Sequence, residues 1–310
     1  MTVVRELHLR YRPKTFKEVV GQKDAIRTLS SMGKSGSIPH LLLFTGPSGC
    51  GKTTLSRIVA GKLKCDSLDF VEINAANNRG IEMVRDIQSR VRAAPMAGPC
   101  RVWLIDEAHA MTGDAQSAFL KLLEEPPDHV YFMLATTNPE KLKNTIRTRS
   151  TEVKCKSVSV RDLSGLVLGV AEEEGRSVDD TVAAKIASVA EGSPRKAMVL
   201  LQAVIGMDDV DRQLDAIEAA ESTKHSIDLA RALLSDKSTW DVIAGILQEM
   251  DDDVETVRWS VMGYCRKILL GSGKKGKARA ALIIEEFSDN LYDSKSAGLA
   301  VRCWNIFSGE

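Results

Sequence analysis

The stretch Leu41-Leu42-Leu43-Phe44-Thr45-Gly46-Pro47-Ser48-Gly49-Cys50-Gly51-Lys52-Thr53 joins a short apolar run to a glycine-rich turn. Its second part, from Gly46 to Thr53, satisfies every position of the phosphate-binding P-loop pattern. The apolar run before it and the helical pattern from Thr53 to Leu63 supply the strand–loop–helix context that the motif requires. A glycine-rich turn that merely caps a helix is the alternative, and the agreement of pattern and context argues against it.

The chemistry of this motif predicts ATP and Mg²⁺ as ligands. Backbone N–H groups of the glycine-rich turn would surround the phosphates, and the helix N-terminus would add a partial positive charge. Lys52 would reach the β and γ phosphates, and the hydroxyl of Thr53 would hold the metal. The predicted nucleotide-binding residues here are Gly46, Pro47, Ser48, Gly49, Cys50, Gly51, Lys52, Thr53 and Thr54.

Polar residues follow two further apolar runs, where the strands of a parallel sheet would end. Asp106-Glu107 comes directly after Val102 to Ile105, and Thr137-Asn138 follows Val130 to Ala135. Asp106 would orient Mg²⁺ and Glu107 would polarise the attacking water, while a hydroxyl or amide at Thr137 or Asn138 could sense the γ-phosphate. Charged or polar strand exits without function are the alternative, and the P-loop makes them the weaker interpretation.

The order of apolar runs and helical patterns predicts a doubly wound α/β domain followed by helices. Continuous apolar runs indicate strands near 41–44, 70–73, 102–105, 130–135 and 151–155. Strand signals fade after residue 156. We expect three domains, at 1–156, 157–221 and 222–310. In the last of them, helical stripes cover 226–235, 239–250, 253–270 and about 277–308.

Composition limits the function classes. The 42 basic and 42 acidic residues give no net charge, which argues against a protein that coats nucleic acid with its whole surface but allows a local basic stripe. The six cysteines form no CxxC pair, so reduced thiols and a cytoplasmic location are expected. The N-terminus lacks the apolar stretch of a secretory signal, and no apolar run approaches membrane-spanning length. We therefore expect no membrane partner.

Several longer stretches resemble the AAA+ clamp-loader ATPases, from about residue 9 to about residue 205. Two of them are similar to stretches of the bacterial gamma/tau subunit. The stretches are Tyr11-Arg12-Pro13-Lys14-Thr15-Phe16, Val19-Val20-Gly21-Gln22, Pro39-His40-Leu41-Leu42-Leu43-Phe44, Leu122-Leu123-Glu124-Glu125-Pro126-Pro127 and Leu134-Ala135-Thr136-Thr137-Asn138-Pro139-Glu140-Lys141-Leu142. The resemblance implies an α/β P-loop AAA+ domain with a helical lid, followed by an all-α collar domain.

The resemblance also assigns residues around the nucleotide. Tyr11, Arg12, Val19 and Val20 would line the base pocket, although Tyr11 and the two valines could equally be packing residues. Arg195 matches the sensor-2 arginine, which contacts the ATP phosphates from the lid. Ser193 and Pro194 suit the cap and first position of a helix, so the helix dipole disfavours a cation at Arg195 by about 0.3–1 kcal/mol unless an anion lies nearby.

A second arginine would act in the site of a neighbouring subunit. Clamp loaders usually carry Ser-Arg-Cys at the position of Thr148-Arg149-Ser150, and the resemblance makes Arg149 the catalytic finger in trans. Arg147 is the alternative. Such a finger stabilises charge on the transferred phosphoryl group.

Basic residues on helical segments predict contact with the DNA backbone. Arg85 and Arg92 are seven residues apart on the predicted helix, and Lys121 lies on a later one. A groove lined by such residues would follow phosphates without reading bases. A solvated helix face is the alternative for each residue alone.

The resemblance implies an ATPase that opens a sliding clamp and loads it on primer–template DNA, in a ring with other clamp-loader subunits that we expect to be pentameric. Lys52, Glu107 and Arg149 would be its catalytic residues. Another AAA+ DNA-remodelling ATPase, such as a recombination-intermediate remodeller or helicase loader, and a non-catalytic scaffold subunit remain alternatives. The chain lacks the cysteine-rich insert of gamma/tau after Cys65 and ends at Glu310, which favours the compact small subunits of replication factor C or of viral loaders.

Overall fold

The computed structural model describes residues 6–34, 38–221, 224–235, 238–250, 253–271, 276–291 and 295–309. Residues 1–5, where a secretory signal would start, and 222–223, where the third predicted domain begins, lie outside this part. Contacts group the chain into two compact units, 1–210 and 211–310. The three-domain division stays a prediction.

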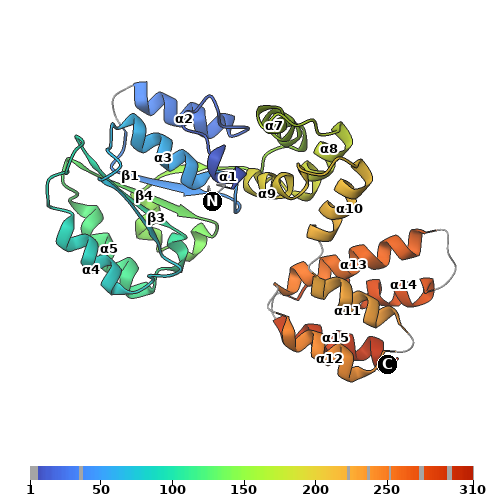
Figure 1. Cartoon of the computed structure of the whole chain (residues 1–310). Helices are drawn as coiled ribbons and strands as arrows, with labels where there is room; N and C mark the ends of the chain where they lie inside the picture. The colour runs from blue at the N-terminus through green and yellow to red at the C-terminus, as the bar shows by residue number, and fades with distance from the viewer. Residues whose placement is uncertain are drawn as a thin grey trace, which may run out of the picture. The chain divides into compact units, whose positions relative to one another are not determined.

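Unit 1 is built on a five-stranded sheet with the order β2-β3-β4-β1-β5 (Figure 1). All neighbouring strands are parallel. The strands are β1 (Leu41–Thr45), β2 (Phe70–Asn74), β3 (Arg101–Asp106), β4 (Val130–Thr136) and β5 (Thr151–Lys154). The five predicted strands and the α/β fold class are therefore confirmed.

Both faces of the sheet are covered, which explains why the central strands are apolar throughout. Leu41 and Leu43 of β1 pack into a core with helices on one face, whereas Leu42 and Phe44 pack into the core on the other. The first core includes residues of α4 (Ile81–Arg90) and α5 (Gly113–Glu124), and the second includes residues of α2 (Lys23–Lys34) and α3 (Lys52–Lys62).

The other helical elements of unit 1 are short or belong to the helical segment after the sheet. They are α1 (Leu7–Arg10), η1 (Ala108–Ala110), η2 (Pro139–Lys141), α6 (Asn144–Arg149), α7 (Val160–Glu173), α8 (Asp180–Val189) and α9 (Pro194–Val204). Ser193 caps α9 by accepting a hydrogen bond from the backbone N–H of Lys196, and Pro194 occupies the first turn. The predicted start of this helix is confirmed.

The carboxyl ends of three central strands meet at one edge of the sheet. Thr45 of β1 is level with Thr136 of β4, and Asp106 of β3 is level with Asn74 of β2. This register brings the P-loop, the Asp106-Glu107 pair and the exit of β4 to the same edge, where ligands bind in doubly wound sheets.

Unit 2 contains only helices in its described residues. They are α10 (Val210–Glu221), which begins at the last residue of unit 1, α11 (Lys224–Leu234), α12 (Trp240–Glu249), α13 (Val254–Leu270), α14 (Lys277–Glu286) and α15 (Lys295–Ser308). The stripe predicted over 277–308 is therefore two helices. Ser288, Asp289 and Asn290 are turn-forming residues, and they follow the end of α14.

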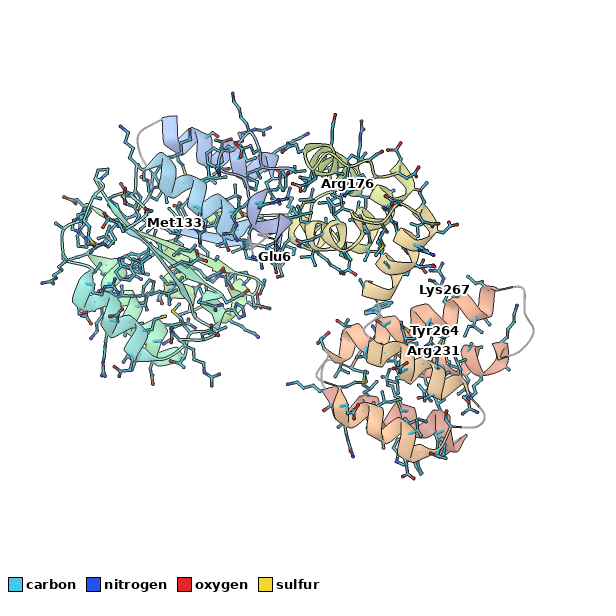
Figure 2. The ribbon with its side chains drawn as sticks, viewed as in Figure 1. Glu6, Met133, Arg176, Arg231, Tyr264 and Lys267 are labelled. Atoms are coloured by element: carbon cyan, nitrogen blue, oxygen red, sulfur yellow. The ribbon has the colours of Figure 1, made fainter. Side chains whose placement is uncertain are left out.

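Polar contacts, one buried and one exposed, join the helices of unit 2. The Arg258 guanidinium forms an ion pair of 2.8 Å with Glu255 and donates to the carbonyl of Phe287 at 2.9 Å. Arg231 of α11 is hydrogen-bonded to Tyr264 of α13, and the contact raises the pKa of Arg231 (Figure 2). In the described part of the chain, no helix is both long and apolar enough to cross a membrane.

Candidate nucleotide site

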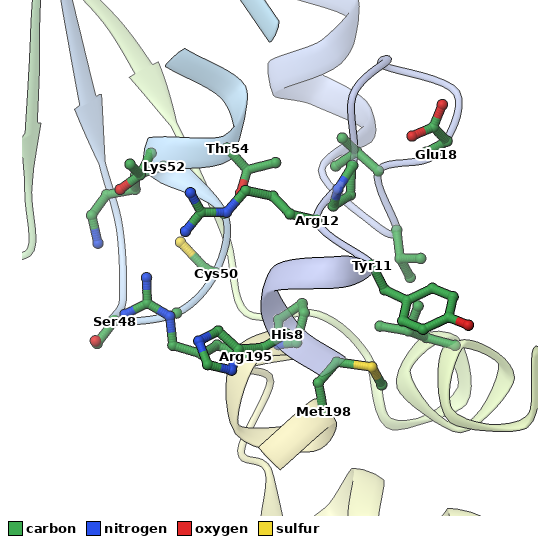
Figure 3. Close-up of a pocket in the computed structure, with 18 of the residues that line it drawn as sticks. His8, Tyr11, Arg12, Glu18, Ser48, Cys50, Lys52, Thr54, Arg195 and Met198 are labelled. Atoms are coloured by element: carbon green, nitrogen blue, oxygen red, sulfur yellow. The ribbon is translucent and has the colours of Figure 1, made fainter. Parts of the chain in front are cut away.

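A pocket at the carboxyl edge of the sheet collects most of the predicted site residues (Figure 3). The predicted residues that line it are Tyr11, Arg12, Val19, Val20, Ser48, Gly49, Cys50, Gly51, Lys52, Thr53, Thr54, Asp106, Glu107 and Arg195. His8, Pro13, Glu18, Leu166, Pro194 and Met198 also line it and were not predicted. Segments from His8 to Met198 thus enclose one cavity. No local sequence pattern indicates the six additional lining residues.

In the P-loop, the ammonium group of Lys52 is hydrogen-bonded to the loop backbone, and a bound phosphate would have to replace these contacts. The Lys52 side chain is only 6% exposed, and its Nζ donates to the carbonyls of Gly46 and Pro47, both at 2.8 Å. Gly51, just before α3, has a φ of +108°, a conformation that favours glycine. The ammonium therefore lies within the loop, where a phosphate could replace the two carbonyls as its partner.

Thr53 and Asp106 form the oxygen pair expected of a Mg²⁺ site. The Thr53 hydroxyl donates to Asp106 Oδ2 at 2.9 Å, although the residues are 53 positions apart. The other Asp106 oxygen accepts from the backbone N–H of Glu107 at 2.9 Å, which fixes the carboxylate. A hydroxyl and a carboxylate fit Mg²⁺, which commonly takes one or two protein ligands and completes its shell with water and phosphate. Among the described residues no cluster of three His, Cys, Asp or Glu could form a metal cage.

Glu107 combines an unusual backbone with an unpaired carboxylate oxygen. Its φ is +50°, a left-handed conformation that is uncommon outside glycine and often found at functional positions. Its Oε2 is buried without a hydrogen-bond partner, and His109 Nδ1 lies 3.4 Å away, outside hydrogen-bond geometry. A buried carboxylate oxygen with spare capacity is suited to accept a proton from water.

His109 connects this carboxylate to the end of β4. Its Nδ1 lies 3.0 Å from Thr136 Oγ1, which in turn accepts from the backbone N–H of Asn138 at 3.1 Å. Thr137 donates to the Asn138 side chain at 2.8 Å. Thr137 and Asn138 do not line the pocket, so their γ-phosphate contact stays a prediction. The link through His109 was not predicted, because it joins two segments 27 residues apart.

The loop and the helix α9 approach each other closely at Gly49. A Cβ at this position would lie 2.1 Å from Ser193 Oγ, so only glycine fits without displacement. The contact brings the first turn of α9, including Arg195, to the P-loop. Figure 3 labels Arg195 and Ser48 among the residues that line the pocket.

Arg12 lies among both positive and negative charges. Burial lowers the pKa of the Arg12 guanidinium, and the positive charges of Arg57 and Arg195 lower it further, while Glu72 and Asp106 act to raise its pKa. A bound polyanion would offset the two lowering effects. The entry segment is itself fixed, because the Tyr11 hydroxyl donates to Glu174 at the end of α7 and this hydrogen bond raises the Tyr11 pKa.

The four residues predicted to act in trans or to contact DNA do not line the pocket, and neither do the predicted P-loop residues Gly46 and Pro47. Arg149, the last residue of α6, is exposed and forms a 3.4 Å ion pair with Glu124. Arg85 is exposed on α4 and pairs with Glu82, and Lys121 is exposed on α5. The helix α4 ends at Arg90, so the seven-residue spacing does not place Arg92 on its face. Their roles stay predictions.

The parallel sheet and the P-loop give this chain the fold of the AAA+ class. Structures of the RuvB Holliday junction branch migration motor and its T158V variant from Thermotoga maritima match with a TM-score of 0.61, covering 82% of this chain and 91% of theirs. The identities are 20% and 21%, so this likeness concerns the fold alone.

Sequence comparison is more specific. A family profile described as DNA polymerase III, delta subunit, matches residues 67–159. DNA polymerase III subunit tau of Bacillus subtilis is 32% identical over 90% of this chain and 54% of its own length. Subunit gamma/tau of Mycobacterium tuberculosis is 36% identical over 64% of this chain and 38% of its own. The chain thus spans about half or less of these relatives, and over that length it is similar to the gamma and tau subunits of DNA polymerase III.

Proposed function

We propose that this chain is a clamp-loader subunit that binds and hydrolyses ATP to open a sliding clamp and load it on primer–template DNA during replication. One observation carries the ATPase part of the proposal. In a complete P-loop, Thr53 is hydrogen-bonded to Asp106, and the neighbouring Glu107 has a free carboxylate oxygen. Subunits that serve only as scaffolds would not need this arrangement. Similarity to the gamma and tau subunits of DNA polymerase III supports the DNA and clamp part.

Different residues of the pocket would bind different parts of the nucleotide. Backbone N–H groups of the P-loop, Lys52 and Arg195 would hold the phosphates, and Tyr11, Val19 and Val20 would surround the base. Bound Mg²⁺ would be held by Thr53 and Asp106 and would neutralise phosphate charge. Binding requires Lys52 to exchange the Gly46 and Pro47 carbonyls for phosphate oxygens.

Glu107 would act as the general base. A water between its free oxygen and the γ-phosphate would lose its proton to this carboxylate as it attacks. His109 lies close enough to respond to the position of the carboxylate. Through Thr136 and Asn138 it would link hydrolysis to the end of β4.

Hydrolysis would also need an arginine from a neighbouring subunit. Arg149 is exposed and absent from the pocket of its own chain, as a residue that acts in trans would be. Its ion pair with Glu124 is between two half-exposed side chains, so breaking it costs little, at most about 1 kcal/mol. The Arg149 guanidinium could therefore leave Glu124 and contact ATP bound to a neighbouring subunit.

Unit 2 would join the subunits into a ring, which we propose to be pentameric. Large apolar side chains remain exposed on its helices, including Trp259 at 62%, Leu270 at 72% and Val301 at 57%. Exposed apolar side chains of this size are typical of interaction surfaces. A cytoplasmic location is part of the same proposal.

DNA contact is proposed for Arg85, with Arg92 and Lys121 as further candidates. Changing Arg85 to Ala should weaken DNA binding for all sequences and lower the slope of log affinity against log salt by about one. Lys62, exposed at the end of α3, offers a matched control. An unchanged slope for Arg85→Ala would make this residue an ordinary surface charge.

The activity is tested by measuring ATP turnover with and without primed DNA, sliding clamps and partner subunits. Stimulation by DNA and clamp together is expected. Glu107→Gln should keep nucleotide binding and lose turnover by about 10²–10⁴-fold. Arg149→Ala should keep binding and basal turnover but lose stimulation by about 10³-fold or more in a complete ring.

Other outcomes would favour the alternatives. Turnover that responds to DNA but not to any clamp would indicate another AAA+ DNA-remodelling ATPase. Binding without turnover under every condition would indicate a scaffold subunit.

A further inference from the structure

Two thiols from distant parts of the chain meet behind the P-loop. Cys50 lies in the loop itself, and Cys155 directly follows β5. The side chains are hydrogen-bonded to each other, both thiols are free, and the residues are only 2% and 4% exposed. Cys50 also lines the nucleotide pocket (Figure 3).

A buried glutamine keeps the two segments together. Gln22 Nε2 donates to the carbonyl of Cys50 at 3.2 Å and to the carbonyl of Lys156 at 2.5 Å. Its Oε1 accepts from the backbone N–H of Lys156 at 2.9 Å. The Gln22 side chain therefore ties the P-loop to the residue after Cys155, whatever the state of the thiols.

A second contact limits the freedom of the same segments. The backbone N–H of Cys155 donates to the carbonyl of Thr45 at 2.7 Å. A Cβ at Gly46 would lie 2.1 Å from the Cys155 carbonyl oxygen and 3.1 Å from its Cβ. The thiol pair is thus part of a tightly packed junction and does not depend on a mobile loop.

A second pair of cysteines provides a comparison within the same domain. Cys65 and Cys100 are also hydrogen-bonded to each other, but they do not line the nucleotide pocket. Burial raises the pKa of both thiols, that of Cys65 to about 12. At the P-loop, the hydrogen bond from Cys155 and the charge of Lys52 outweigh burial and lower the pKa of Cys50 to about 7. Thiolates are the reactive form, so the two pairs should differ in reactivity.

We propose that Cys50 and Cys155 form a peroxide-sensitive thiol pair whose oxidation to a disulfide closes the nucleotide site. The Cys50 thiolate attacks one oxygen of the peroxide, which leaves a sulfenic acid on Cys50 and releases hydroxide. The Cys155 thiol then attacks the Cys50 sulfur, forms the S–S bond and releases water. Two thiols and one hydrogen peroxide give one disulfide and two waters.

The bond would change the loop that must surround the phosphates. Sulfur atoms in a disulfide are about 2.0 Å apart, much closer than hydrogen-bonded thiols, so Cys50 would move towards Cys155. Lys52 is only two residues further along, and small displacements in a binding site cost much affinity. Because Cys50 lines the pocket, bound nucleotide should in turn slow its oxidation. This inference rests on the proposed nucleotide binding.

The test combines peptide mapping with nucleotide binding on the whole chain. The chain is treated with hydrogen peroxide with and without an ATP analogue and Mg²⁺, and disulfides are mapped by mass spectrometry without reduction. A Cys50–Cys155 cross-link should form before any Cys65–Cys100 cross-link, and the analogue should slow it. Affinity for a fluorescent ATP analogue should fall by about tenfold or more and recover with dithiothreitol.

Two variants make the result specific. Cys155→Ser should bind nucleotide when reduced and form no disulfide at Cys50. Cys100→Ser, which removes the other pair, should lose nucleotide affinity on oxidation as the unaltered chain does. If no Cys50–Cys155 cross-link forms, or if the cross-linked chain binds nucleotide as before, the proposal is wrong even when the reduced chain binds ATP. If the reduced chain binds no nucleotide, the proposed function is wrong. The proposed closure of the site by oxidation is then wrong as well.

Discussion

In unit 2 the buried guanidinium of Arg258 has a carboxylate partner in Glu255 and donates to the carbonyls of Phe287 and Ser288. In the nucleotide site, Lys52 is buried to a similar degree but bonds only to two loop carbonyls. Among the described residues no carboxylate forms an ion pair with it. The first arrangement includes a counter-charge within the chain, and in the second a bound phosphate would supply it. Burial of a charged side chain alone therefore does not distinguish a structural residue from a ligand-binding residue. The presence or absence of an oppositely charged partner within the chain does distinguish them.

The largest effect is expected from breaking the first arrangement. Changing Arg258 to Ala leaves Glu255, 8% exposed, without its cation, and losing one partner of a buried pair costs about 3–5 kcal/mol. Urea unfolding followed by far-ultraviolet circular dichroism would measure the loss. The control is Arg266→Ala, at an exposed position of the same helix, which should change stability by at most about 0.5 kcal/mol. Equal stability of the two variants would contradict a structural role for the buried pair.

A smaller effect of a different kind is expected at Lys52. Removing its ammonium should lower affinity for an ATP analogue by about 10–100-fold, since hydrogen bonds to charged groups contribute about 1.5–3 kcal/mol. The free energy of unfolding should fall less than in Arg258→Ala, because no buried carboxylate loses its cation. Lys62→Ala, on an exposed position of the same helix, should bind nucleotide normally. A Lys52→Ala chain that is destabilised yet binds ATP would reverse the comparison.

The smallest effect concerns a buried carboxylate with complete partners inside unit 1. Burial alone would raise the pKa of Asp69, but backbone N–H groups of Ala97, Met96 and Gly98 and the Arg101 guanidinium lower it to about 2. A lowered pKa means that this stabilisation is present above pH 4 and is lost as the pH falls towards 2, about 2 kcal/mol in all.

Urea unfolding at pH 5 and pH 3 would show this dependence. Asp69→Asn should be less stable at pH 5 and should lose less stability between the two values than the unaltered chain. Asp86→Asn, at an exposed position of α4, serves as the control and should follow the unaltered chain. Equal pH dependence of Asp69→Asn and the unaltered chain would show that Asp69 does not contribute in this way.

Local sequence patterns predicted the sheet and the centre of the site. An apolar run and the P-loop motif are both short sequence patterns, so β1 and its loop could be located from the sequence alone. The acids after β3 were assigned to the same site because the carboxyl ends of parallel strands lie at one edge of the sheet. The pairing of Thr53 with Asp106 is a consequence of that rule.

Contacts between distant segments could not be predicted in the same way. The Gln22 bridge to Lys156 and the contact of His109 with Thr136 depend on the packed structure, and no residue pattern identifies them. The end of α14 before α15 was missed, although the turn-forming residues Ser288, Asp289 and Asn290 follow it in the sequence. A positive charge without a partner is likewise visible only when its surroundings are known.

We propose that a bound triphosphate is the natural partner of Lys52. A crystal structure of the chain with a non-hydrolysable ATP analogue and Mg²⁺ would test this proposal. We expect Lys52 Nζ to leave the carbonyls of Gly46 and Pro47 for the β and γ phosphates, with Mg²⁺ beside Thr53 and Asp106. An empty pocket, or a Lys52 that keeps both carbonyls while nucleotide binds elsewhere, would contradict it.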